Sequence, residues 1–263
     1  MRYAEYAPAA ALAPVVDRFW FLEGPGSGVP EPIIPDGRLE IVFHYGVRFN
    51  HHRDDGQVER QAPSMVVGQM LAPISIGHHG VAGVAGIRLR PAAARAVVGC
   101  SAAELTNRFV DLEDVFGTTA TLRERLAAGP DDATRVALLG SWLDGRVRGV
   151  PARDVDAAVT AITATGGRVD LVRVAFRAGI GLRQLERRFL ADVGVAPKTF
   201  ARMVRLQAAL RQISDGQPLA DVAHACGYYD QPHMARDFSL LAQTSPAAWR
   251  RHAGGLTPLF VAR

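Results

Sequence analysis

Two predicted helices carry arginine, glutamine and glutamate on their outer faces, and these side chains can hydrogen-bond the base edges of DNA. Their apolar stripes are Leu185 with Phe189 and Met234 with Phe238, each pair four residues apart. The outer faces carry Arg183, Gln184, Glu186, Arg187 and Arg188 in the first helix, and Gln231, Ala235 and Arg236 in the second. Short helices of this kind fit the recognition helix of a helix-turn-helix unit, and the alternative is an ordinary helical bundle with a solvated arginine face.

The segments that contain these helices are two copies of one unit. Residues 174–179 are repeated at 222–227, Leu185-x-Arg187-x-Phe189 at Met234-x-Arg236-x-Phe238, and Ala196-Pro197 at Ser245-Pro246, with offsets of 48 or 49. Each copy predicts a helix, a tight turn at Gly179 or Gly227, and a second helix. Asp170 and Asp230 are predicted to cap the helices that follow them. Because the unit occurs twice, DNA binding is favoured over the simple bundle.

One long helix is predicted between the two units, over residues 197–214. Such a helix is roughly 25 Å long, and could hold two recognition helices about one DNA turn, ~34 Å, apart. The distribution of charge agrees with contact to a polyanion. Residues 1–150 hold 15 basic and 17 acidic side chains, whereas residues 151–263 hold 15 basic and only 9 acidic ones.

The first part of the chain has a different pattern. Short β-rich runs occur at residues 41–45, 64–68, 74–76 and 84–89, separated by glycine and proline, as in small barrels or sandwiches. Helical patterns follow at 91–98, 102–107, 119–127 and 132–146. We expect an α+β chain of two domains, residues 1–150 and 151–263, with the boundary at Arg148-Gly149-Val150-Pro151.

The second unit resembles the DNA-binding domain of the AraC/XylS family of transcription regulators. The resemblance rests on residues 220–223, Cys226-Gly227-Tyr228, residues 234–238 and residues 244–250, and it extends over about residues 157–252. Tyr228 stands where the family usually has Phe, and Gln243 where it prefers Gly. In the first domain, residues 34–43, 67–69 and 86–91 are similar to a subgroup of the family that has a Pro-Asp-Gly segment.

This resemblance implies an all-α tandem helix-turn-helix domain that binds duplex DNA. It also implies an N-terminal cupin-like β-barrel that holds a small-molecule effector, followed by helices that mediate dimerisation. The residues that it places against bases are Arg183, Glu186, Arg187, Gln231, Pro232, Ala235 and Arg236. Arg177, Lys198, Arg202, Arg205 and Arg250 are assigned to phosphates, with idle surface charge as the alternative for each. Because Pro232 and Ala235 offer only apolar contacts, we expect the first unit to make most of the sequence-specific base contacts, and so to be the principal reader of the DNA sequence.

The predicted barrel contains polar residues that could line an effector pocket or close a loop. They are Asp36, Arg38 and Glu40, which alternate in a strand-like run, together with His44. The histidines of this domain match no metal-binding spacing, and the two cysteines are far apart. We therefore expect no metal, no disulfide framework and no cofactor.

An enzyme is the alternative class, because some proteins join this DNA-binding domain to an alkyl-transferring repair module with a reactive cysteine. Cys100 has no neighbouring Cys or His to lower its pKa, and no other catalytic pattern is present, so we expect no catalytic residues. No run approaches the ~20 apolar residues of a membrane span. The sequence predicts a cytoplasmic regulator that binds duplex DNA and a small effector, with RNA polymerase and a second copy of the chain left open as partners.

Overall fold

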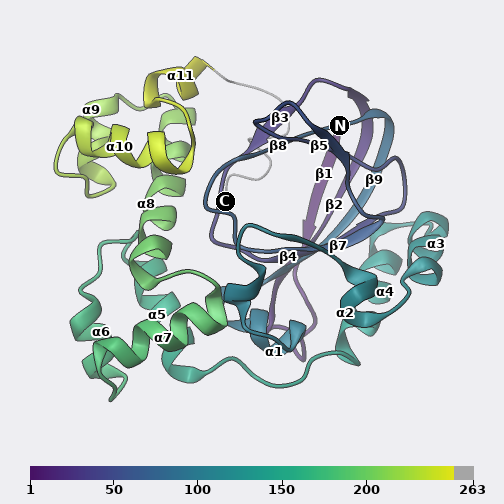
Figure 1. Ribbon diagram of the computed structural model, residues 1–263, viewed down its shortest axis with the longest axis horizontal. Coiled ribbons are helices and arrows are strands. Elements are labelled where there is room, and N and C mark those ends of the chain that lie inside the picture. The colour runs from purple at the N-terminus through teal and green to yellow at the C-terminus, as the bar shows by residue number, and fades with distance from the viewer. Residues whose placement is uncertain (252–263) are drawn as a thin grey trace.

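The computed structural model describes residues 1–251, in which a β domain precedes a helical domain (Figure 1). Residues 252–263, the end of the predicted second domain, lie outside the described residues. The α+β fold class predicted from the sequence is confirmed. No helix among residues 1–251 combines the length and the apolar composition that crossing a membrane requires.

The β domain contains two antiparallel sheets. The larger sheet has the strand order β1-β2-β9-β4-β7-β10, and the smaller has β3-β8-β5-β6. The strands are β1 Arg2–Tyr6, β2 Val16–Ser27, β3 Glu31–Ile33, β4 Glu40–His44, β5 Asn50–His52, β6 Val58–Arg60, β7 Ser64–Val67, β8 Ile74–Gly77, β9 His79–Leu89 and β10 Phe109–Asp111. The four β-rich runs of the sequence correspond to β4, β7, β8 and β9.

The long strand β2 is buried on both faces. Phe19 and Phe21 pack into the core under the helices of this domain, whereas Trp20 and Leu22 pack between the two sheets. Successive side chains of a strand point to opposite faces, so a strand with two buried faces needs a continuous apolar run. The aromatic run therefore belongs to the core, but it shows no alternation, which is why its sequence did not indicate a strand.

The segment from Asp36 to Arg38 is a tight loop, and the expectation of a strand-like run over Asp36, Arg38 and Glu40 was wrong. The Asp36 carboxylate accepts a hydrogen bond from the backbone N–H of Arg38 at 2.9 Å, and β4 begins only at Glu40. Gly37 has a φ of +78°, and a Cβ atom there would lie 2.8 Å from Cε2 of Phe200 in the helical domain. The positive φ and the close approach both require glycine.

Short helices follow β9, near the positions predicted from the sequence except for α2, which was not predicted. They are the 3-10 helices Pro91–Ala93 and Ala102–Leu105, and α1 Ala94–Val98, α2 Leu112–Phe116, α3 Ala120–Ala128 and α4 Asp132–Asp144. Leu122 and Leu126 of α3 and Leu139 and Leu143 of α4 are buried in the same core as Phe19 and Phe21. The apolar faces of α3 and α4 are thus used within the chain.

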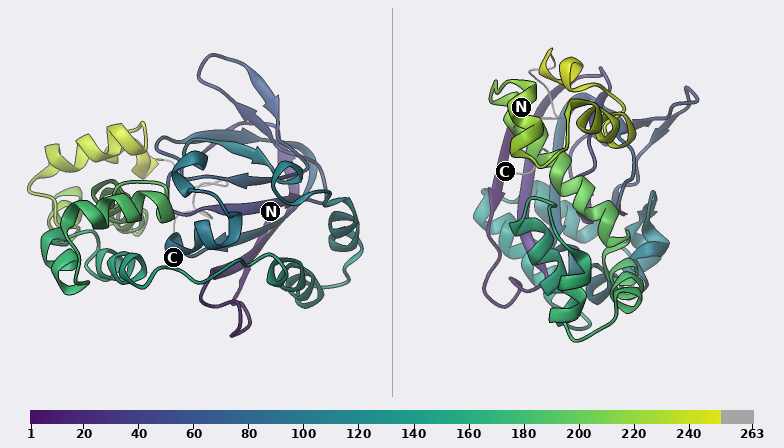
Figure 2. Two further views of the ribbon diagram at one scale, coloured as in Figure 1. Left: turned by 60° about the horizontal axis from the view of Figure 1, so that its bottom comes forward. Right: turned by 90° about the vertical axis from the view of Figure 1, so that its left-hand side faces the viewer.

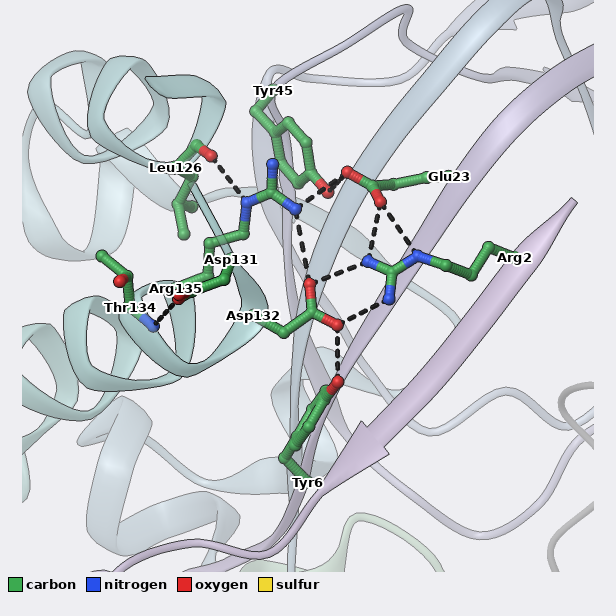
Figure 3. A network of polar contacts seen from close by, with 9 residues as sticks. All are labelled: Arg2, Tyr6, Glu23, Tyr45, Leu126, Asp131, Asp132, Thr134 and Arg135. Atoms are coloured by element: carbon green, nitrogen blue, oxygen red, sulfur yellow. Dashed lines mark hydrogen bonds and ion pairs between the residues drawn. The ribbon is translucent and has the colours of Figure 1, made fainter. Parts of the chain in front are cut away.

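A polar network fastens α4 to the edge of the larger sheet (Figure 3). Asp132, at the start of α4, accepts hydrogen bonds from both terminal nitrogens of Arg2 at 2.7 and 2.8 Å and from the Tyr6 hydroxyl at 2.6 Å. Glu23 of β2 accepts from Arg2 at 2.7 Å and from Arg135 of α4 at 2.9 Å. The Arg2 guanidinium, with Tyr6, lowers the pKa of Asp132 to about 2, so its charged form stabilises the fold.

Replacing Asp132 with Asn is expected to lower the free energy of unfolding at pH 7 by about 2 kcal/mol. Because the folded pKa lies below that of the unfolded chain, the contribution of Asp132 is complete above about pH 4 and disappears as the pH falls towards 2. Urea denaturation between pH 7 and pH 3 measures the difference between the two proteins. Asp114→Asn, an exposed position in α2, is the control. Equal losses for both variants at pH 7 would contradict the prediction.

The helical domain has one long helix between two groups of short ones (Figure 2). Its helices are α5 Arg153–Ala164, α6 Leu171–Arg177, α7 Leu182–Val193, α8 Pro197–Ser214, α9 Leu219–Ala225, α10 Gln231–Leu241 and α11 Pro246–Arg251. α8 runs from α5–α7 at one end to α9–α11 at the other (Figure 1). The helices predicted in both units, and the long helix between them, are confirmed.

Candidate nucleic-acid interface

Each unit has one helix with an aspartate N-cap and a glycine turn between its two helices. The capped helix is the first one in the first unit and the second one in the second unit. The Asp170 carboxylate accepts hydrogen bonds from Val172 N and Arg173 N at the start of α6, and Asp230 accepts one from His233 N at the start of α10. The turns between the helices contain Gly179, with a φ of +69°, and Gly227, with a φ of +74°. The turn at Gly179 sets the angle at which α7 follows α6, and the turn at Gly227 with the Asp230 cap sets the angle at which α10 follows α9.

The buried stripes predicted for α7 and α10 are the cores of the two units. Leu185 and Phe189 pack with Phe200 of α8, and the rings of Phe189 and Phe200 are 5.6 Å apart. Met234 and Phe238 pack in a second cluster beside the other end of α8. Each helix therefore buries one face and leaves the opposite face in solvent.

The residues predicted to contact bases all lie on these outer faces. Arg183, Glu186, Arg187, Gln231, Pro232, Ala235 and Arg236 are all exposed. Within residues 1–251 none of them forms an ion pair, so their charged groups are available to a partner. Arg188, by contrast, forms an ion pair with Asp154 of α5 at 2.7 Å. The structure brings the predicted base-contacting residues to two exposed helix faces, and their roles stay a prediction.

The residues predicted to contact phosphates fall into two groups. Lys198, Arg177 and Arg250 are exposed, although Arg250 donates a hydrogen bond to the backbone oxygen of Gln217 at 2.6 Å. Arg202 and Arg205 of α8 are only partly exposed, and each lies beside Asp237 of α10. For these two arginines, contact with DNA must compete with an ion pair inside the domain.

Comparisons with known proteins agree with this arrangement. Residues 174–252 match the family described as a helix-turn-helix domain, and residues 4–111 match a domain of unknown function, DUF6597. A crystal structure of ToxT from Vibrio cholerae is 9% identical with a TM-score of 0.50, and covers 89% of this chain and 99% of that one. An AraC-type regulator from Chromobacterium violaceum is 22% identical over 38% of this chain and 92% of that one, with a TM-score of 0.36. No curated protein matches the chain.

The decisive observation is that the matched family model lies on the duplicated unit whose caps, turns and outer faces are described above. The match to a helix-turn-helix domain over residues 174–252 falls on the part of the chain where the sequence predicted an AraC-type domain, and that name is kept for it below. Domains of this type bind DNA in transcription regulators. The likeness to ToxT shows that the order of a β domain followed by such a helical domain also occurs in that protein.

A groove of about 880 Å³ separates the two units of the AraC-type domain. Its walls come from α8, α10 and the segment that leads into α6. Five basic residues line it, namely Arg168, Lys198, Arg202, Arg205 and Arg236. Sequence reasoning did not single out Arg168 or Asp237, which also lines the groove. Neither residue belongs to a predicted recognition face. Asp237 reaches the groove because α10 packs on α8, and Arg168 lies in the segment that leads into α6.

The predicted pocket residues of the β domain line two small adjoining cavities. Glu40, Val42 and His44 of β4 line a largely apolar cavity of about 80 Å³ between the sheets. Asp36 and Arg38 line a second cavity of about 50 Å³, and Glu40 and Ile74 belong to both. The structure thus brings the four predicted residues together around Glu40. Their binding role stays a prediction.

Among the polar groups around these cavities, His44 and Arg88 are buried, whereas Asp36, Arg38 and Glu40 are partly buried. Glu40 accepts a hydrogen bond from Arg88 Nε at 2.7 Å, and these residues are direct partners in neighbouring strands. Burial raises the pKa of Glu40 and lowers the pKa of His44 to about 4, so His44 is neutral at neutral pH. Within residues 1–251, His44 Nδ1 has no hydrogen-bond partner. No three His, Cys, Asp or Glu side chains gather there as a metal site requires.

The β domain and its short helices contact the AraC-type domain through α5, α7 and α8. The buried Gln207 of α8 donates a hydrogen bond to the backbone oxygen of Pro35 at 2.8 Å. Within the β domain, Gln69 holds the same loop by donating to the backbone oxygen of Gly37 at 2.8 Å. Thr106 donates to the backbone oxygen of Gly194, directly after α7, at 2.6 Å. The loop that borders the second cavity therefore lies directly against the helix that joins the two units.

Cys100 lacks the surroundings of a reactive cysteine. It is half-buried, and burial together with the Glu104 carboxylate raises the pKa of its thiol. A nucleophilic cysteine needs the opposite shift, because the thiolate is the reactive form. This environment gives no support to the alkyl-transfer alternative.

Proposed function

We propose that this protein is a sequence-specific transcription regulator in which both helix-turn-helix units bind one DNA duplex. The observation that carries the proposal is the pair of exposed recognition faces joined by α8. A helix of 18 residues is about 27 Å long, so it acts as a rigid spacer between the units. We expect the two faces to fit successive major grooves, with Lys198 and Arg177 in contact with the phosphate backbone.

Binding to duplex DNA is expected to weaken steeply as salt is added. If about six phosphates are neutralised, the logarithm of the association constant falls with a slope of roughly −5 against the logarithm of salt concentration. Fluorescence anisotropy with duplexes selected from genomic fragments measures this slope. An affinity that does not change with salt, or no binding to any duplex at low salt, would contradict the proposal.

The second part of the proposal is that a small effector binds between the sheets of the β domain. The support is the largely apolar cavity beside His44, which offers an unpaired ring nitrogen, and beside the carboxylate of Glu40. Sites for small molecules combine apolar walls with a few polar groups in this way, and a cavity of about 80 Å³ must widen to take a ligand of more than a few atoms. The loop at residues 34–37 provides a route from the cavity to α8, and hence to both recognition helices.

A thermal-shift screen of small metabolites tests this part, because a ligand that binds the folded chain must stabilise it. Val42→Phe places a ring in the cavity, so the stabilisation by a true effector is expected to disappear in this variant. A shift that persists would locate the ligand elsewhere. RNA polymerase and a second copy of the chain remain predicted partners. Because the proposed target is chromosomal DNA, we also propose that the protein is cytoplasmic.

A further inference from the structure

The groove between the two units contains an acidic residue at its floor. Asp237 lies on α10 directly after Arg236, and its side chain is only 4% exposed. Its Oδ1 accepts a hydrogen bond from Arg202 Nε at 2.9 Å and lies 2.8 Å from Arg202 Nη2. Its Oδ2 lies 3.7 Å from Arg205 Nε and accepts no hydrogen bond from the described residues. One carboxylate thus faces two arginines of α8.

The second arginine is held less tightly than the first. Arg205 makes no hydrogen bond to Asp237 at 3.7 Å, and its guanidinium lies over the ring of Tyr228 at 5.0 Å. Arg202 is held by two short contacts, but its side chain is still about one-third exposed. Both guanidinium groups can therefore turn towards an anion that enters the groove.

The position of the groove indicates which anion that is. The groove lies between α10 and the start of α6. In the proposed complex one duplex contacts both recognition helices, and we expect its phosphodiester backbone to pass this groove. Five basic side chains line the groove and only two acidic ones, Asp170 and Asp237. The Asp170 carboxylate is already bound to the backbone of α6. Its basic excess suits a DNA backbone.

We propose that Asp237 competes with DNA phosphates for Arg202 and Arg205, and so limits the strength of sequence-independent binding in this groove. This rests on the proposed function, because it needs a duplex to span both units. Phosphate contacts carry no sequence information, whereas base contacts do. An internal competitor for the phosphate contacts therefore lowers the affinity for target and non-target DNA alike, so that stable binding depends more on the base contacts.

The test compares Asp237→Asn with Asp221→Asn in the full chain on one fixed duplex of arbitrary sequence. Both substitutions remove one negative charge, but Asp221 is exposed on α9 and forms no ion pair within residues 1–251. For Asp237→Asn, the slope of the logarithm of the association constant against the logarithm of salt concentration is expected to become more negative by about one to two. The reason is that one or two further phosphates are neutralised. For Asp221→Asn the slope is expected to change by less than roughly 0.5. Equal slopes for the two variants would overturn the proposal.

Arg202→Gln provides a second measurement that does not depend on the folding of Asp237→Asn. Alone, it is expected to make the slope shallower, and an unchanged slope would overturn the proposal. In the double variant with Asp237→Asn, it is expected to remove about half of the steepening of the salt slope that Asp237→Asn causes alone. The reason is that both residues act on the contact between Arg202 and a DNA phosphate. If the unmodified chain binds no duplex at all, the proposed function fails. If it binds DNA but Asp237→Asn and Asp221→Asn have equal salt slopes, the proposed competition by Asp237 is wrong and the proposed function stands.

Discussion

Replacing both Arg183 and Arg187 with Ala is expected to reduce affinity for the target sequence by about 2 to 6 kcal/mol, a factor of at least about 30. The reason is that each arginine can make a bidentate pair with guanine, and each such pair contributes roughly 1–3 kcal/mol of discrimination. Both side chains are exposed on α7, so their removal leaves the core of the unit unchanged. Titration of the selected duplex at constant salt measures the loss.

The matched control is Arg188→Ala in the same helix. This residue already pairs with Asp154, and it is expected to change affinity by less than tenfold, or about 1.4 kcal/mol. In the second unit, Arg236→Ala removes the one arginine of that recognition face and is expected to cost about 1–3 kcal/mol. If Arg236→Ala weakens binding more than the double variant in the first unit does, the second unit is the principal reader and the expectation for the first is wrong.

Phe200→Ala is expected to lower the free energy of unfolding by about 3–5 kcal/mol. The ring is buried, packs against Phe189 in the first unit, and also covers Gly37 of the β domain. Its loss opens a cavity where the first unit, α8 and the loop at residues 34–37 meet. We expect faster proteolysis of both the loop and α7, which limited digestion followed by mass spectrometry would locate.

Phe176→Ala is the control for this prediction, because the Phe176 ring is 83% exposed on α6. The same chemical change there is expected to alter stability by about 0.5 kcal/mol or less. If both variants lost the same stability, the packing around Phe200 would not be the cause. A loss below roughly 1 kcal/mol for Phe200→Ala would show that the joint tolerates the missing ring.

The sequence predicted the helical domain well because its signals are local. Capping aspartates and apolar pairs four residues apart describe each helix without reference to distant residues, and the repeat then shows that the same pattern occurs twice. Leu185, Phe189, Met234 and Phe238 are all buried as their spacing required. In the β domain the same reasoning found β4, β7, β8 and β9 but missed others, among them β1 and β2.

The remaining features depend on contacts between residues that are far apart in the chain. The Asp237 carboxylate meets Arg202 only because α10 folds back on α8, and a separation of 35 residues leaves no pattern in the sequence. The strand-like reading of Asp36, Arg38 and Glu40 followed polar alternation, but the positive φ of Gly37 and the contact with Phe200 make the segment a loop. Local preference was overridden there by tertiary contact.

The two cores of the AraC-type domain each contain a side chain from the β domain. Ile34 is buried in the cluster with Met234 and Phe238, and Ala92 in the cluster with Leu185 and Phe189. Recombination that exchanges whole domains between regulators would therefore separate core residues that must fit one another. A segment that could be exchanged between regulators without loss of packing is therefore larger than the DNA-binding domain. It must include Ile34 and Ala92 together with the helices that enclose them.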